Sequence, residues 1–128
     1  MTPMILVVED HPEMSSLITR TLRPQGYDVV TVADGETALT VAEAQPPDLV
    51  IADVQLPGMD GLTVVATLRR QEPLLPVIVI SAVCDVLEDL KVIPAGLDLE
   101  SMSFLPKPFG LRSLMDLVDQ LLPLPLMA

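Results

Sequence analysis

Five polar residues in this 128-residue chain could form one chemical site: the neighbours Glu9 and Asp10, then Asp53, Ser81 and Lys107. Each lies at or just beyond the end of a short apolar run. Three carboxylates that lie close together repel one another unless a hard divalent cation sits among them. Mg²⁺ suits such a place, because it binds one or two carboxylates and completes its shell with carbonyl, water and phosphate oxygens. These residue types predict a magnesium site if the fold brings them together.

A simpler interpretation is open for each residue taken alone. Glu9 or Asp10 could cap a helix or solvate a loop. Ser81 could be an ordinary hydroxyl at a strand end, and Lys107 a solvated surface lysine. The five residues together favour a shared site over these separate roles.

Short strands are predicted at five apolar runs: residues 4–8, 29–32, 49–52, 77–80 and 102–105. Three of these runs lack alternation between polar and apolar residues, which is typical of strands covered on both faces by helices. Apolar residues at helical spacing lie between them and predict three amphipathic helices. The stripes are Leu17, Ile18, Thr21 and Leu22 in the first helix, Ala38, Leu39, Val41 and Ala42 in the second, and Leu62, Val65, Ala66 and Leu68 in the third.

Prolines and helix-capping residues lie where this order of strands and helices requires a helix to begin. Pro12 suits the first turn of the first helix, Asp34 is a cap candidate for the second, and a last helix is predicted at residues 111–122. The alternation of strands and helices predicts an α/β fold of the doubly wound (βα)5 class with a parallel sheet. In the flavodoxin-like strand order 2-1-3-4-5, Glu9, Asp10 and Asp53 would meet at the carboxyl edge of neighbouring strands.

Composition narrows the possible partners and location. The net charge is −11, the seven lysines and arginines are scattered, and no aromatic platform accompanies them, so no nucleic-acid partner is expected. One cysteine, Cys84, cannot form an internal disulfide, which favours a reduced cytoplasm. The longest apolar run, residues 74–84, is broken by Pro76 and is shorter than the ~18 residues of a membrane span. With no basic segment typical of a secretory signal, we expect a cytoplasmic protein without membrane insertion.

Motifs at the expected strand ends resemble one known family, the response regulator receiver domains of two-component signalling, which are called CheY-like. The likeness covers nearly the whole chain. The segments that carry it are ILVVED at 5–10, GYDV at 26–29, ADGETAL at 33–39, PDLVIAD at 47–53, LPGMDG at 56–61, PVIVISA at 76–82 and FLPKPF at 104–109. The resemblance implies a receiver domain at residues 1–122, followed by a tail or the start of a linker at 123–128.

The same resemblance implies a phosphoacceptor switch rather than an enzyme acting on other molecules. Asp53 would take a phosphoryl group from a phosphohistidine on a histidine kinase or phosphotransfer protein. Glu9, Asp10, Asp53 and the backbone carbonyl of Gln55 would hold Mg²⁺. Lys107 would contact the phosphoryl oxygens, and its bond to the following proline is expected to be cis.

Ser81 and Phe104 would form the conformational switch that the resemblance implies. Ser81 would donate its hydroxyl to the phosphoryl group, and the Phe104 ring would become buried as the Ser81 loop moves inward. Ser81 as a plain hydroxyl and Phe104 as an ordinary core aromatic stay open as alternatives. A downstream protein partner would bind the surface of helix 4, strand 5 and helix 5.

The sequence departs from most receivers between Ser81 and Lys107. The segment is longer than usual, and Pro94 interrupts the predicted helix 4, of which only residues 83–93 keep helical spacing. This lengthened segment is similar to receivers attached to hybrid sensor histidine kinases. A free-standing regulator or one piece of a larger protein fits equally.

Two other functions are less compatible with these residues. A turnover phosphatase that uses Asp53 would need a general acid two residues later, where Gln55 stands. A constitutive interaction module that is never phosphorylated is disfavoured by the intact set of acids.

We interpret His11 as a helix cap and place it outside the site, because it stands alone beside a proline at a helix start. Asp60 is expected to support the turn into the third helix, and Gly58 and Gly61 to serve the backbone around Asp53.

Overall fold

Strands and helices alternate along the computed structural model, which describes residues 2–82 and 102–122. The elements are β1 (Met4–Val8), α1 (Pro12–Leu22), the 3-10 turn η1 (Arg23–Gln25), β2 (Asp28–Val32), α2 (Gly35–Ala44), β3 (Leu49–Asp53), α3 (Gly61–Gln71), β4 (Val77–Ala82), β5 (Ser103–Lys107) and α5 (Leu111–Leu121). Among the helices of these residues, none is long and apolar enough to cross a membrane.

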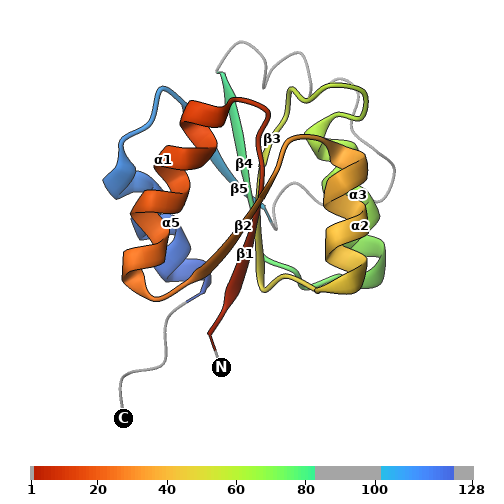
Figure 1. The fold of residues 1–128 in the computed structure, drawn as a ribbon, viewed down its shortest axis with the longest axis horizontal. Helices are drawn as coiled ribbons and strands as arrows, with labels where there is room; N and C mark the ends of the chain where they lie inside the picture. Colours follow the sequence, from red (N-terminus) through yellow and green to blue (C-terminus); the bar gives the residue numbers. More distant parts are fainter. Residues whose placement is uncertain (1, 83–101, 123–128) are drawn as a thin grey trace.

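The five strands form one parallel sheet in the order β2-β1-β3-β4-β5. Helices α1 and α5 cover one face, and α2 and α3 cover the other (Figure 1). The predicted doubly wound class and strand order are therefore confirmed. The register pairs Val8 of β1 with Ala52 of β3, which places the two strand ends, and the acids that follow or end them, side by side.

The central strands are apolar because both of their faces are covered. Every residue of β1 and of β3 is buried, whereas the edge strand β2 has exposed, intermediate and buried positions. Successive residues of β1 then point to opposite layers. Leu6 packs in the cluster beneath α2 and α3, and Ile5 and Val7 pack in the cluster beneath α1 and α5.

Local signals set the helix starts as predicted. Pro12 lies in the first turn of α1. Asp34 accepts a hydrogen bond from the Thr37 N–H (2.8 Å), and Asp60 accepts one from the Thr63 N–H (2.9 Å), so each caps the helix that follows it. The cap on α3 matters most for function, because this helix begins directly after the loop that follows β3.

Several strands extend beyond the apolar runs that predicted them. β3 includes Asp53, β4 continues to Ala82, and β5 runs from Ser103 to Lys107 rather than over residues 102–105. The reason is that the ladder uses backbone groups, so it continues through polar side chains. β2 begins one residue early, and α5 ends at Leu121, one residue before the prediction. The predicted helix at 83–93, Pro94 and the tail at 123–128 lie outside the described residues.

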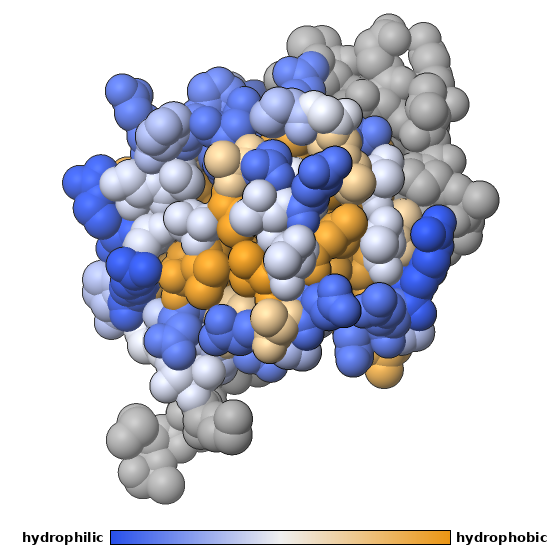
Figure 2. All heavy atoms as spheres, turned by 45° about the vertical axis from the view of Figure 1, so that its right-hand side comes forward, coloured by the Kyte–Doolittle hydropathy of each residue, from blue (hydrophilic) through white to orange (hydrophobic). Residues whose placement is uncertain are grey.

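The surface beside α2 and α3 is partly apolar. Figure 2 shows apolar side chains near the middle of the view that brings this side of the molecule forward, with polar side chains around them. Three partly buried hydrophobic residues of β2 and α2, namely Val30, Leu39 and Val41, pack against the cluster beneath this face. Much of the exposed apolar surface here is therefore the outer rim of the core.

Candidate functional site

The carboxyl edge of the sheet brings together the residues that the sequence singled out. Glu9 follows β1, Asp53 ends β3, Ser81 lies near the end of β4 and Lys107 ends β5. Glu9 and Asp53 are each only 3% exposed, and Ser81 is 2% exposed. The two buried carboxylates, Glu9 and Asp53, need partners or a ligand, because burial of a charge without either is costly.

Lys107 is the cation of this cluster. Its Nζ lies 2.5 Å from Asp53 Oδ2 and 3.9 Å from Glu9 Oε1. Partial burial would lower the pKa of Lys107, but the hydrogen bond and charge of Asp53, together with the charge of Glu9, raise it overall. Lys107 is thus held in its charged form beside the Asp53 carboxylate. The Lys107-Pro108 peptide bond is cis, as predicted.

The second oxygen of Asp53 is fixed by the following turn. Asp53 Oδ1 accepts a hydrogen bond from the Gln55 N–H (2.9 Å), and the Gly61 N–H donates to the Val54 carbonyl (2.8 Å). Gly61 approaches this turn so closely that a Cβ there would clash with the carbonyl oxygen of Asp53. Gly58 adopts a positive φ of 78°. The expectation that both glycines serve the backbone around Asp53 is confirmed.

Two carboxylate oxygens of the site, Glu9 Oε2 and Asp10 Oδ1, are buried and have no hydrogen-bond partner among the residues that the structure describes. The pKa of Glu9 is raised to about 7, mainly by burial and further by a hydrogen bond with Asp53 and the charge of Asp53, while Lys107 and His11 oppose the shift. Oxygen ligand atoms of Glu9, Asp10 and Asp53, with a nitrogen of His11, all lie within 4.8 Å of one another. A divalent cation would satisfy the unpartnered oxygens, so the donor set fits the predicted metal.

His11 belongs to this cluster, contrary to the sequence interpretation. It occupies the N-cap position of α1, but its side chain makes no capping hydrogen bond. Its Nδ1 instead lies 3.1 Å from Glu9 Oε1, with hydrogen-bond geometry, and 3.2 Å from Asp10 Oδ1. The available signal was its position directly after the acid pair and before Pro12, which starts α1 and thereby limits where the imidazole can go.

The two predicted switch residues lie on adjacent strands. Ser81 of β4 stands opposite Pro106 of β5, and Phe104 of β5 stands opposite Val79 of β4. The Phe104 ring is half-buried and packs against the cluster beneath α2 and α3. This intermediate exposure is compatible both with a switch and with a core aromatic, so the predicted role of Phe104 stays a prediction.

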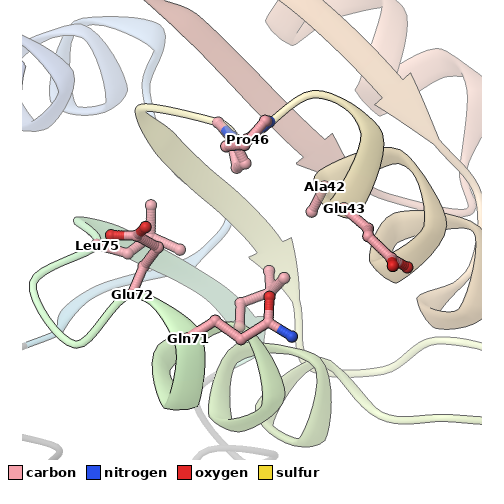
Figure 3. A pocket seen from close by; sticks show the side chains of 8 residues that line it. Ala42, Glu43, Pro46, Gln71, Glu72 and Leu75 are labelled. Atoms are coloured by element: carbon pink, nitrogen blue, oxygen red, sulfur yellow. The ribbon is translucent and has the colours of Figure 1, made fainter.

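A separate pocket lies at the opposite end of the sheet, between the ends of α2 and α3 (Figure 3). Its apolar lining includes Ala42 and Leu75, and its acidic lining is Glu43 and Glu72. Both glutamates are exposed. The pocket is thus distinct from the buried carboxylates at the carboxyl edge.

Comparison with known proteins gives one consistent family. The family model described as "Response regulator receiver domain" matches residues 5–119. The transcriptional regulatory protein TcrA of Mycobacterium tuberculosis is 44% identical over 110 residues, which cover 86% of this chain and 42% of that protein.

Two crystal structures of receivers are similar over most of the chain. The response regulator TrrA of Thermotoga maritima, in complex with Mg²⁺-BeF, has a TM-score of 0.80 and 30% identity and covers 94% of this chain and 100% of that chain. The receiver domain of the hybrid histidine kinase CckA has a TM-score of 0.74 and 36% identity and covers 93% of this chain and 98% of that chain. Because the relatives include both a hybrid kinase and transcriptional regulators, the attachment to a hybrid kinase stays a prediction.

The chain spans less than half the length of the transcriptional regulators TcrA and PhoP, the latter from Bacillus subtilis. What those whole proteins do is therefore not transferred to this chain.

Proposed function

Since the chain belongs to the response regulator receiver domain family, we propose that it is a phosphoacceptor switch of a two-component or phosphorelay system. Asp53 is the acceptor. The observation that carries this proposal is the buried Asp53 carboxylate, paired with Lys107 at 2.5 Å and placed beside two unpartnered carboxylate oxygens. A nucleophile, a cation and a set of acidic metal ligands are the parts that phosphoryl transfer needs.

The proposed reaction moves a phosphoryl group from nitrogen to oxygen. A carboxylate oxygen of Asp53 forms a bond to phosphorus, the P–N bond of a partner's phosphohistidine breaks, and the neutral imidazole leaves with the electron pair. The turn at Gln55 and the ammonium of Lys107 hold the carboxylate in place before the reaction. The same ammonium then neutralises charge on the phosphoryl oxygens.

Glu9, Asp10, Asp53 and the Gln55 carbonyl are the proposed ligands for Mg²⁺. When bound, the ion neutralises charge on the transferring phosphoryl group and orients it. The buried and unpartnered Glu9 Oε2 and Asp10 Oδ1 support this assignment. The Mg²⁺-BeF complex of the similar protein TrrA is consistent with it.

Phosphorylation would shift the population between two conformations. The Ser81 hydroxyl would turn to the phosphoryl group, and Phe104 would move further into the cluster beneath α2 and α3. The proposed upstream partner is a histidine kinase or phosphotransfer protein. A downstream protein would bind a surface that includes β5 and α5, with the predicted helix 4 outside the described residues.

Intact mass after incubation with acetyl phosphate tests the proposal. One added phosphoryl group is expected with Mg²⁺, none with a chelator, and none in Asp53→Asn. The matched control is Asp48→Asn, because Asp48 is an acid before β3 that accepts a hydrogen bond from the Met4 N–H (2.8 Å). It should be modified like the parent protein. No added mass in folded protein with Mg²⁺ would instead favour a constitutive, unphosphorylated interaction module.

A further inference from the structure

His11 gives the acidic site a nitrogen donor that a magnesium site does not need. Its Nδ1 is 3.1 Å from Glu9 Oε1 and 3.2 Å from Asp10 Oδ1. The imidazole is thus directed at the acid pair from the solvent side, while Glu9 and Asp53 form the buried side. One imidazole with three carboxylates is a mixed N/O set, and such a set is typical of zinc and other borderline transition metals.

The described geometry is close to what a small ion needs. Ligand atoms of Glu9, Asp10, His11 and Asp53 lie within 4.8 Å of one another. Two ligand atoms bound to one tetrahedral zinc ion at about 2.0–2.2 Å lie about 3.3–3.6 Å apart. His11 Nδ1 already lies close to this spacing from Glu9 Oε1 (3.1 Å) and Asp10 Oδ1 (3.2 Å), and the widest pair of the set would have to close by up to about 1.5 Å. Glu9 Oε2 is buried without a partner, which leaves one oxygen of the set free to bind.

We infer that the acidic site, with His11 as a ligand, binds borderline divalent ions of the zinc class more tightly than Mg²⁺ and that His11 supplies this selectivity. The inference rests on the proposed function, because it concerns the same carboxylates. A zinc-class ion held there engages the Asp53 carboxylate. It therefore competes with Mg²⁺ for the same carboxylates.

The chain offers a clean reporter for this inference. His11 is the one histidine in the sequence, so the ring resonances of untagged protein are assigned without ambiguity. Cys84 is the one cysteine, and a thiolate would also bind zinc. The titrations therefore use a Cys84→Ser background, with Zn²⁺ alone and Mg²⁺ alone, followed by NMR of the imidazole and by calorimetry.

In the parent protein, Zn²⁺ is expected to shift the His11 ring resonances and to bind at least about tenfold more tightly than Mg²⁺. His11→Ala and His11→Asn should each weaken Zn²⁺ binding by about tenfold or more, with Mg²⁺ affinity changed by less than about threefold. Asn is a favoured N-cap residue, so His11→Asn keeps α1 intact and removes only the imidazole. Glu13→Gln, which removes an exposed acid from the first turn of α1, is the matched control and should change neither affinity.

Equal Zn²⁺ affinity in the parent protein and both His11 variants, or unmoved ring resonances, would overturn this inference and leave the proposed function intact. If neither ion binds any variant in folded protein, the proposed magnesium site falls as well, and the inference with it.

Discussion

Acidic side chains occur at both ends of the sheet, in different surroundings. At the amino end, Asp48 accepts a hydrogen bond from the Met4 backbone, and Glu43 and Glu72 are exposed beside the pocket between α2 and α3. At the carboxyl end, Glu9 and Asp53 are buried and share one cation. The two ends of the sheet have the same type of residue. Their chemistry differs because the acids at the carboxyl end are buried and lie close to one another.

The two ends also differ in what their polar groups do for the fold. Tyr27, at the amino end, places its hydroxyl 3.0 Å from the Leu122 carbonyl oxygen and 3.2 Å from Asp119 Oδ1, which ties β2 to the end of α5. Glu9 and Asp10, at the carboxyl end, keep buried oxygens without partners. The Tyr27 hydroxyl is satisfied by the protein itself, whereas Glu9 Oε2 and Asp10 Oδ1 have no hydrogen-bond partner among the described residues.

Removal of the Lys107 cation from the carboxyl end of the sheet should have the largest effect, and this effect is on the rate of phosphorylation. In Lys107→Met, the rate of phosphorylation by acetyl phosphate should fall by about a hundredfold or more, because the variant loses the ammonium that is paired with Asp53. Arg70→Met makes the same charge change at the exposed end of α3 and should keep the parent rate. A time course of intact mass measures both rates. Similar rates in the two variants would place the reaction outside this cluster.

A methyl group added behind Asp53 should break the loop that holds it. Gly61→Ala should lower the free energy of unfolding by about 3 kcal/mol, because the new Cβ would clash with the Asp53 carbonyl oxygen. Gly110→Ala, where a Cβ meets nothing within 4 Å, should cost less than about 1 kcal/mol. Urea unfolding compares the two. Equal costs would show that the close approach at Gly61 is absent in solution.

Stability of the metal-free protein should depend on pH through Glu9. Its pKa is raised to about 7 in the folded state, from 4.5, so folding favours the protonated form. The stabilisation is fully present below pH 4.5 and is lost as the pH rises through about 7. Between pH 5 and 8, the parent protein should lose roughly 1 to 2 kcal/mol relative to Glu9→Gln.

Thermal unfolding with a chelator measures this pH dependence. Glu43→Gln at the amino end is the control and should follow the parent protein at every pH. A Glu9→Gln variant that also tracks the parent would contradict the buried, proton-binding state of Glu9. Added Mg²⁺ should stabilise the parent protein above pH 7 and so reduce its difference in stability from Glu9→Gln. Below pH 7 the ion should bind more weakly, because it competes with the proton for Glu9.

Substitution of Tyr27 should have the smallest effect, and it tests the amino end of the sheet alone. Burial and Asp119 raise the pKa of the Tyr27 hydroxyl to about 12, so its absorbance should titrate near pH 12 instead of pH 10. The stability that this hydroxyl contributes should be lost as the pH rises above 10 toward 12. Tyr27→Phe should cost about 1 kcal/mol at neutral pH and leave phosphorylation unchanged. Slower phosphorylation in this variant would mean that the two ends are coupled.

Much of the fold was predictable because its signals are local or periodic. The apolar runs at β1 and β3 identified central strands, and Asp34 and Asp60 identified helix starts. The doubly wound class allows more than one strand order, and the flavodoxin-like order 2-1-3-4-5 is the one that predicts Glu9 beside Asp53.

The atomic detail of the site was not predictable, because it depends on contacts across strands. Sequence spacing cannot show that Lys107 pairs with one Asp53 oxygen while Gln55 holds the other. The direction of the His11 ring likewise depends on the turn between β1 and α1. The predicted N-cap position of His11 is confirmed, but its exclusion from the acidic cluster was wrong. Gly61 was expected to serve the backbone, but its contact with the Asp53 carbonyl required coordinates.

The central claim is that Asp53 receives the phosphoryl group because it is the buried acid paired with Lys107. Borohydride reduces an aspartyl phosphate to homoserine, so reduction after treatment with acetyl phosphate and Mg²⁺, followed by peptide mass spectrometry, locates the modified residue. The account predicts homoserine at position 53 alone, with unmodified acid at Asp10 and Asp48. Homoserine at either of those positions, with Asp53 unchanged, would contradict it.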